Sequence, residues 1–330
     1  MINKFINLTK IHGSPEGAFL MGFAYALIGI LVAFFLFPGY IGIVSVFFTS
    51  MALMPLISKL TQELALREGR EKEITEKGVT LTELNLRGKK FSVKGLWLDH
   101  KQLIQVYFYS FFGIFLLFSL FIFILPQENG DYNGLIQIKT GNNELVSDEY
   151  IFNEQFQAYH KMTGNDASGS AIGNASEQCL FGECYKFEFF ISIIKNNLWV
   201  LIVTFLVSLI YGFGAMFIIT WNASVWGIVF ANRSLELAPI AGKNPVVFFG
   251  LLMLTVLPHT ALEALTYFTA AISGGIASKG MEKEDFESER LERVLTHSLI
   301  LMGVSLFLLV LAAFMETYVI SIINDMIQVF

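Results

Sequence analysis

Residues Leu103–Leu125 read LIQVYFYSFFGIFLLFSLFIFIL, and no charged side chain interrupts them. A helix needs roughly 20 apolar residues to cross the hydrocarbon layer of a bilayer, so this stretch is long enough to span one. The rest of the chain has the same character, because 54% of its 330 residues are hydrophobic and only 15% are charged. A soluble domain carries about 25% charged residues. The sequence therefore predicts an all-α, polytopic helical integral membrane protein.

Other stretches also have the length and hydropathy of membrane spans. Three of them qualify without interruption: Ala18–Phe37, Leu198–Trp221 and His297–Ile323. Ile41–Ile57 is shorter and follows the first span across a Pro-Gly-Tyr turn, which predicts a helical hairpin. Pro245–Ala277 is apolar but contains Pro258, so it can form one kinked span, two short spans or a re-entrant hairpin. We expect five to seven membrane helices, including a broken or re-entrant segment around Pro258.

The distribution of Lys and Arg predicts the orientation of the chain. The linker at residues 58–102 holds ten basic residues, whereas the loop at 126–190 holds three beside ten acidic residues. Cytoplasmic loops of membrane proteins carry an excess of Lys and Arg. We therefore expect a multi-pass protein of the cell membrane with the N-terminus and the linker in the cytoplasm. The loop at 126–190 is expected outside.

The same segments suggest three regions: a tail and transmembrane hairpin at 1–57, a charged and amphipathic linker at 58–102, and a membrane domain at 103–330. Cys179 and Cys184 are the two cysteines of the chain, and both lie in the predicted outer loop. Cysteines outside the cytoplasm often pair, so this spacing is compatible with a small disulfide-closed turn. Two free thiols are the alternative.

Polar side chains inside the predicted spans are candidates for function. His259 and Glu263 are four residues apart, so on a helix they share one face. Glu316 lies within the last predicted span. A charged side chain within a membrane segment costs roughly 2–3 kcal/mol and usually faces a protein interior, a pore or a proton relay. The cluster is either a site for an ion, a proton or a solute, or a set of hydrogen bonds that fixes helix packing. Its expected members are His259, Glu263, Glu316, Asn196, Asn197 and Asn222.

Small residues at helical spacing predict close contacts between spans, because glycine lets two backbones approach. We expect such packing within one chain, although a homo-oligomer is also possible. The helix-breaking and close-packing positions are Pro258, Gly212, Gly214, Gly227, Gly274 and Gly275.

Motifs of common enzyme sites are missing from the sequence. It contains no Walker loop, no HExxH metal helix, no GxSxG elbow and no paired CxxC. We therefore expect no enzymatic activity, no cofactor and no metal. The modest net charge of −6 is spread along the chain and indicates no nucleic-acid partner.

Several short motifs, in order, resemble the stage II sporulation protein M family of membrane proteins. The shared motifs are Lys195-Asn196-Asn197, Gly212 and Gly214, Asn222 and Gly227, Pro258-His259 with Glu263, the run from Ala270 to Ala277, and Ala312-Ala313 with Glu316. Gly22-Phe23-Ala24-Tyr25 and Ile28-Gly29-Ile30 resemble the longer archaeal members. One position departs from the family pattern, because Thr260 stands where these proteins usually have glycine after Pro-His.

The resemblance implies a membrane scaffold, since the bacterial namesake works with cell-wall-degrading partners. By this analogy the chain is an assembly subunit that recruits membrane or surface proteins at the bilayer. The residues themselves also support a transporter or channel component with a site at His259, Glu263 and Glu316. The scaffold is therefore the expected function, and a transporter or channel component is the alternative.

Overall fold

The computed structural model describes residues 14–76, 93–127, 133–137, 139, 145–163, 183–212, 214–285 and 287–319. Within these residues, seven helices are long and apolar enough to cross a membrane. The prediction of an all-α polytopic membrane protein is confirmed. The helices are α2 (Pro15–Leu36), α3 (Ile41–Glu76), α5 (Val93–Ile124), α6 (Asp148–Thr163), α7 (Glu183–Tyr211), α8 (Ala215–Ile240), α9 (Pro245–Lys283) and α10 (Glu289–Phe314), followed by the π-helix η2 (Met315–Val319).

The first two helices form the predicted hairpin, and α2 packs along both α3 and α5. Glycines make the approach of α2 to α5 very close. A Cβ on Gly22 would collide with the backbone carbonyl of Ser110, and a Cβ on Gly113 would collide with that of Phe19. Because each helix presents a glycine to the other's backbone, the hairpin is part of the same packed body as α5.

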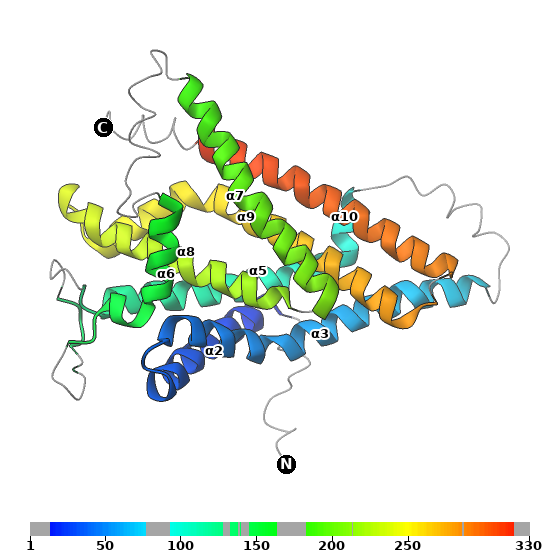
Figure 1. The fold of residues 1–330 in the computed structure, drawn as a ribbon, viewed down its shortest axis with the longest axis horizontal. Coiled ribbons are helices and arrows are strands. Elements are labelled where there is room, and N and C mark those ends of the chain that lie inside the picture. The colour runs from blue at the N-terminus through cyan, green and yellow to red at the C-terminus, as the bar shows by residue number, and fades with distance from the viewer. Residues whose placement is uncertain are drawn as a thin grey trace.

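Between α7 and α8 the structure corrects the sequence prediction. The apolar run Leu198–Trp221 is not one span, because α7 ends at Tyr211 and α8 begins at Ala215. Gly212 lies in the turn with a φ of 68°, a left-handed conformation that favours glycine. The chain reverses there, and α8 then continues through Asn222 without a break (Figure 1).

The segment around Pro258 is neither broken nor re-entrant, contrary to the expectation. Residues Pro245–Lys283 form the single helix α9, with Pro258 inside it. Proline lacks an N–H group and removes one backbone hydrogen bond from a helix. One missing bond does not end a helix of this length, because α9 is held along its sides by α7, α8 and α10.

The bundle has two distinct ends (Figure 1). One end carries the last turns of α3 and the connection between α9 and α10. The opposite end carries the turns between α2 and α3 and between α8 and α9, together with α6. Helix α6 lies across that end against α3 and α8, and it buries Ile151, Phe152 and Phe156. Within the described part of the predicted outer loop, Lys139 and Leu145 form one isolated β-bridge.

Candidate functional site

A hydrogen-bonded acidic residue lies near the middle of α9. The phenolic hydroxyl of Tyr267 donates to Oε1 of Glu263 at 2.7 Å. The two residues are four apart on the helix, which brings their side chains onto one face. Glu263 is half-buried, and Tyr267 is buried. The bond therefore fixes one carboxylate oxygen and leaves the other, Oε2, available.

A second carboxylate that interacts electrostatically with Glu263 belongs to another helix. Glu316 belongs to η2, the π-helical continuation of α10, and it is also half-buried. Its charge interacts electrostatically with Glu263 and with Tyr267. Single π-helical turns often occur at functional sites. Glu263, Tyr267 and Glu316 are called the carboxylate site below.

The wall around the carboxylate site is apolar. Tyr267 packs in a cluster with Leu201 of α7, Ala270 of α9 and Leu309 of α10. Helices α7, α9 and α10 therefore enclose the phenol ring together. This packing restricts the ring and so determines where its hydroxyl points.

His259 lies one turn before Glu263 on the same face of α9, as the spacing predicts. Its side chain is 8% exposed, and its Nδ1 has no hydrogen-bond partner among the described residues. No hydrogen bond in the described part joins it to Glu263, which instead accepts from Tyr267.

The three asparagines of the predicted cluster are placed differently. Asn196 is exposed on α7 and donates to Oδ1 of the buried Asn197 at 3.1 Å. Asn222 is buried on α8 and donates to the backbone carbonyl of Ile218 at 2.8 Å. These bonds lie within single helices. The structure thus keeps the hydrogen bond of Glu263 within α9 and that of Asn222 within α8.

The predicted close-packing glycines lie at contacts between helices. A Cβ on Gly227 would stand 2.5 Å from the carbonyl oxygen of Phe115, and one on Gly274 would stand 2.5 Å from that of Phe205. Gly275 is buried in α9 beside Gly274. Gly214 precedes α8, where a Cβ would meet Val207. Thr260 turns its hydroxyl back to the carbonyl of Val256, so the departure from the family pattern is absorbed within α9.

Sequence analysis did not identify the contact between His100 and His297. Their Nε2 atoms are 3.0 Å apart, although the residues are 197 positions apart in the chain. His100 is buried at the start of the α5 span, and His297 lies near the start of the α10 span. Both positions are at the polar margins of apolar runs, where the sequence gives no signal of pairing.

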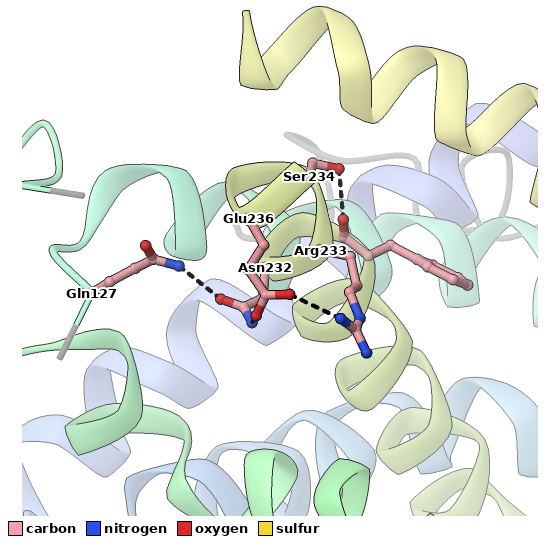
Figure 2. Close-up of polar contacts among 6 residues, drawn as sticks. Gln127, Asn232, Arg233, Ser234 and Glu236 are labelled. Atoms are coloured by element: carbon pink, nitrogen blue, oxygen red, sulfur yellow. Dashed lines mark hydrogen bonds and ion pairs between the residues drawn. The ribbon is translucent and has the colours of Figure 1, made fainter. Parts of the chain in front are cut away.

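A second missed group connects α5 to α8 (Figure 2). Gln127 donates to Asn232 at 2.9 Å, and Asn232 donates to Glu236 at 2.8 Å. Arg233 forms an ion pair with Glu236 at 3.0 Å, with both side chains about two-fifths exposed (42% and 43%). Gln127, Asn232, Arg233 and Glu236 are called the polar band below. The predicted span Leu198–Trp221 ends before the polar band, so the sequence prediction placed Asn232, Arg233 and Glu236 outside the membrane spans. In the structure they belong to α8.

Two further expectations concern ligands. Among the residues described, no three side chains of His, Cys, Asp or Glu are grouped as metal ligands. The predicted disulfide lies outside the described residues, since Cys179 and the side chain of Cys184 are not among them. The chemistry that the carboxylate site offers is that of proton or cation binding, because two carboxylates and a phenol supply only oxygen atoms.

The comparison with known proteins agrees with the motifs. The family model described as stage II sporulation protein M matches residues 30–320, which confirms the resemblance over most of the chain. No curated protein and no solved structure matches the chain.

Proposed function

The chain belongs to the stage II sporulation protein M family, and we propose that within this family it is a transport component of the membrane. It acts as a carrier or channel subunit that moves a proton, an ion or a small solute. The observation that carries the proposal is Glu263 near the middle of α9, half-buried inside the bundle and bonded to the buried Tyr267.

The energetic reason is the environment of this carboxylate. A charged residue near the middle of a membrane helix costs about 2.5–3.5 kcal/mol on insertion scales, and Glu263 has such a position. A bundle held together only by packing gains nothing from this carboxylate. A site that alternately holds and releases a positive ion makes use of it. For this reason the carboxylate site favours transport over a purely structural role.

Other polar groups between α9 and α10 provide a useful contrast. Ser305 donates to the backbone carbonyl of Thr266 at 2.7 Å, and Ser273 does the same to Ser298. These hydroxyls are neutral, buried and fully occupied by the neighbouring helix. They have the properties expected of interhelical hydrogen bonds that fix packing. Glu263 and Glu316 have the opposite properties, being chargeable, mutually repulsive and half-buried.

The orientation proposed from the linker extends to the α9–α10 connection. The stretch at 278–296 contains four basic residues, Lys279, Lys283, Arg290 and Arg293, beside six acidic ones, and it lies at the same end of the bundle as the last turns of α3. The orientation rule counts Lys and Arg and gives little weight to Asp and Glu. An excess of basic residues marks the cytoplasmic side. Under this orientation α6 and the α8–α9 turn lie outside, and the carboxylate site lies between the two surfaces.

Flux through reconstituted protein tests the proposal. Purified full-length protein is placed in lipid vesicles loaded with a pH-sensitive dye, and gradients of H⁺, Na⁺ and K⁺ are imposed in turn. We expect protein-dependent flux of one of these ions that is lost in Glu263→Gln. Glu292→Gln is the matched control, because Glu292 is exposed at the start of α10. Equal flux in Glu263→Gln and the natural protein would count against the carboxylate site.

A scaffold role is the second candidate, and the turn between α8 and α9 favours it. The hydrogen bond from Gln127 to Asn232 marks where the chain leaving α5 meets α8. Helix α8 continues past this point and ends at Ile240. Beyond the band three apolar side chains, Ile240, Val246 and Val247, are exposed by 83%, 62% and 58%, on either side of the exposed Lys243 and Asn244. Residues 240–247 are called the hairpin tip. An apolar tip outside a polar band is typical of a protein contact.

Purification from the native host in mild detergent tests the scaffold role. Mass determination of the tagged complex is expected to show a second protein in fixed stoichiometry. Ile240→Ser together with Val246→Ser would release this protein, and Leu299→Ser, exposed on α10 by 68%, would retain it. A homo-oligomer without another protein would exclude recruitment through the hairpin tip.

A further inference from the structure

A pocket on the exposed side of α7 has the chemistry of a site for a lipid headgroup. We propose that it binds a phospholipid whose headgroup carries a phosphate and a primary ammonium, as in phosphatidylethanolamine. Lys195 and Ser192 hold the phosphate, and Glu188 holds the ammonium. The pocket is separate from the carboxylate site, and lipid binding there does not depend on transport.

The described residues that line the pocket all come from the first half of α7. They are Phe187, Glu188, Ile191, Ser192 and Lys195, and the pocket has a volume of about 360 Å³. This volume lies within the range of small-molecule sites, about 300–1,000 Å³. Glu188, Ser192 and Lys195 are exposed, so the pocket opens away from the packed core of the bundle.

Both charged residues belong to the part of α7 that is apolar enough to cross a membrane, Phe187–Tyr211. Glu188 is the second residue of this span, and Lys195 lies seven residues further in, about 10 Å along the helix axis. A charged side chain that faces lipid at this depth is costly. Lysine side chains therefore extend along apolar surface toward the membrane interface. Because helical side chains lean toward the helix N-terminus, the ammonium of Lys195 extends toward Glu188.

Neither charge is neutralised within the described part of the chain. The two ion pairs of that part lie elsewhere, one in α8 and one near the end of α9. Glu188 and Lys195 are seven residues apart, whereas side chains that pair directly on a helix are three or four residues apart. Two opposite charges on one side of α7 are therefore left for a ligand that lies between them.

The order of the two charges along α7 matches that of the headgroup. In a phospholipid the phosphate is joined to the glycerol, and the ammonium lies further out, toward water. Lys195 is deeper in the span, and Glu188 is nearer to the start of α7. The deeper cation therefore faces the phosphate, and the outer carboxylate faces the ammonium. In both contacts an ammonium group donates charge-assisted hydrogen bonds to anionic oxygens.

The other residues on this side of α7 suit the rest of the lipid. Ser192 is three residues before Lys195, so its hydroxyl is placed to donate to a second phosphate oxygen. Ile191 contributes apolar surface to the pocket. Trp199 is four residues after Lys195 and 69% exposed, and its ring offers apolar surface for an acyl chain below the headgroup. The side chains thus change from charged to apolar in the same direction as the lipid does.

Two other occupants fit the pocket less well. A quaternary ammonium has no N–H to donate and is bound by cages of aromatic rings, whereas Phe187 is the single aromatic side chain among the described lining residues. A second copy of the chain, related by a twofold axis along the membrane normal, would place Lys195 opposite Lys195. Like charges that face each other in an apolar layer repel. A headgroup with one phosphate and one primary ammonium has neither disadvantage.

Lipid titration of the full-length protein tests the site. Protein stripped of lipid in mild detergent is titrated with phosphatidylethanolamine, phosphatidylcholine or phosphatidylglycerol, and native mass spectrometry measures the bound lipid. We expect phosphatidylethanolamine to bind about tenfold more tightly than the other two, because it alone offers a hydrogen bond from a cation to Glu188. Equal affinity for the three lipids would overturn the proposal.

Two variants separate the two contacts. Glu188→Gln should lower the affinity for phosphatidylethanolamine to that for phosphatidylcholine, and it should not weaken phosphatidylglycerol. Lys195→Met should weaken all three lipids about tenfold, because the phosphate is common to them. Lys243→Met is the matched control, since Lys243 is exposed and lies outside the pocket, and it should change no affinity. If Glu188→Gln keeps the preference for phosphatidylethanolamine, the assignment of the ammonium is wrong.

The same spectra decide whether a second copy occupies this side of α7. A dimer of the natural protein that becomes monomeric in Lys195→Met would overturn the lipid site and assign the pocket to a contact between copies. A monomer with bound phosphatidylethanolamine supports the lipid site. Both substituted side chains are exposed, so the variants should fold, and elution from a sizing column checks this.

Discussion

Ser273 of α9 and Ser298 of α10 each donate a hydroxyl to the other's backbone carbonyl, at 2.7 Å and 2.8 Å. Their Oγ atoms are 3.1 Å apart. Both side chains are buried. The two helices are thus joined by a reciprocal pair of hydrogen bonds that requires a serine on each side.

This reciprocity predicts energetic coupling between the two serines. Ser273→Ala and Ser298→Ala are each expected to lower the free energy of unfolding, and the double variant to lose less than the sum. The coupling should be about 0.6 kcal/mol and at most about 1.7 kcal/mol, the range for interhelical bonds in membranes. Unfolding in bicelles measures it. Thr296→Ala is the control, because Thr296 bonds within its own helix; a coupling of zero would show that the bonds are independent.

Contact between α2 and α5 predicts that Gly22 and Gly113 tolerate no larger residue. Alanine at either position would place a Cβ against a backbone carbonyl of the other helix, and it should lower the free energy of unfolding by about 1–3 kcal/mol, as overpacking does. At Gly303 of α10 a Cβ meets nothing within 4 Å. Gly303→Ala should leave the thermal midpoint equal or raise it. Equal midpoints for all three variants would contradict the close contact.

Gly212 should be sensitive for a different reason. A Cβ there meets only Ser278 and Lys279, at 3.6 and 3.7 Å, so space is not limiting. The φ of 68° is the constraint, and Gly212→Ala should cost about 1–2 kcal/mol, with Gly212→Asn costing less. Gly250→Ala, at a helical position with open space, controls for the substitution itself. Thermal unfolding of the three variants gives the order; Asn worse than Ala would refute the left-handed turn.

Placement of α6 and the α9–α10 connection at opposite ends predicts opposite accessibility. In a background with Cys179→Ser and Cys184→Ser, single cysteines are introduced at Asn153 of α6 and at Glu287, both exposed. A membrane-impermeant maleimide should label Asn153→Cys only from outside. It should label Glu287→Cys only in inverted vesicles. Labelling of both from one side would mean that the bundle does not span the bilayer along its length.

The sequence was sufficient for the fold class, the hairpin of α2 and α3, and the family. Each rests on a property summed over many residues, such as the uninterrupted apolar run in α5. The sequence did not predict the boundary between α7 and α8, because Gly212 lies inside an apolar run. Hydropathy gives no signal for a turn between equally apolar residues. The α9 prediction was wrong for a related reason, since neighbouring helices stabilise the segment around Pro258.

The candidate site also has some features that the sequence predicts and others that only the structure gives. His259 and Glu263 are related by local helix geometry, and their spacing was sufficient to place them on one face. Tyr267 follows the same spacing, yet only the structure identifies it as the partner of Glu263. The contact of His100 with His297 depends on how two distant helices pack, and no local pattern carries that information.

The turn at Gly212 affects whether the number of membrane crossings is odd or even. With α7 and α8 as two separate helices the apolar helices number seven among the described residues, and an odd number of crossings would put Pro15 and Phe314 on opposite faces of the bilayer. Had the run Leu198–Trp221 been a single crossing, both would share a face. A reporter fused near each of these residues would therefore report different compartments. The left-handed backbone conformation of Gly212, which ends α7, is the feature that distinguishes seven crossings from six.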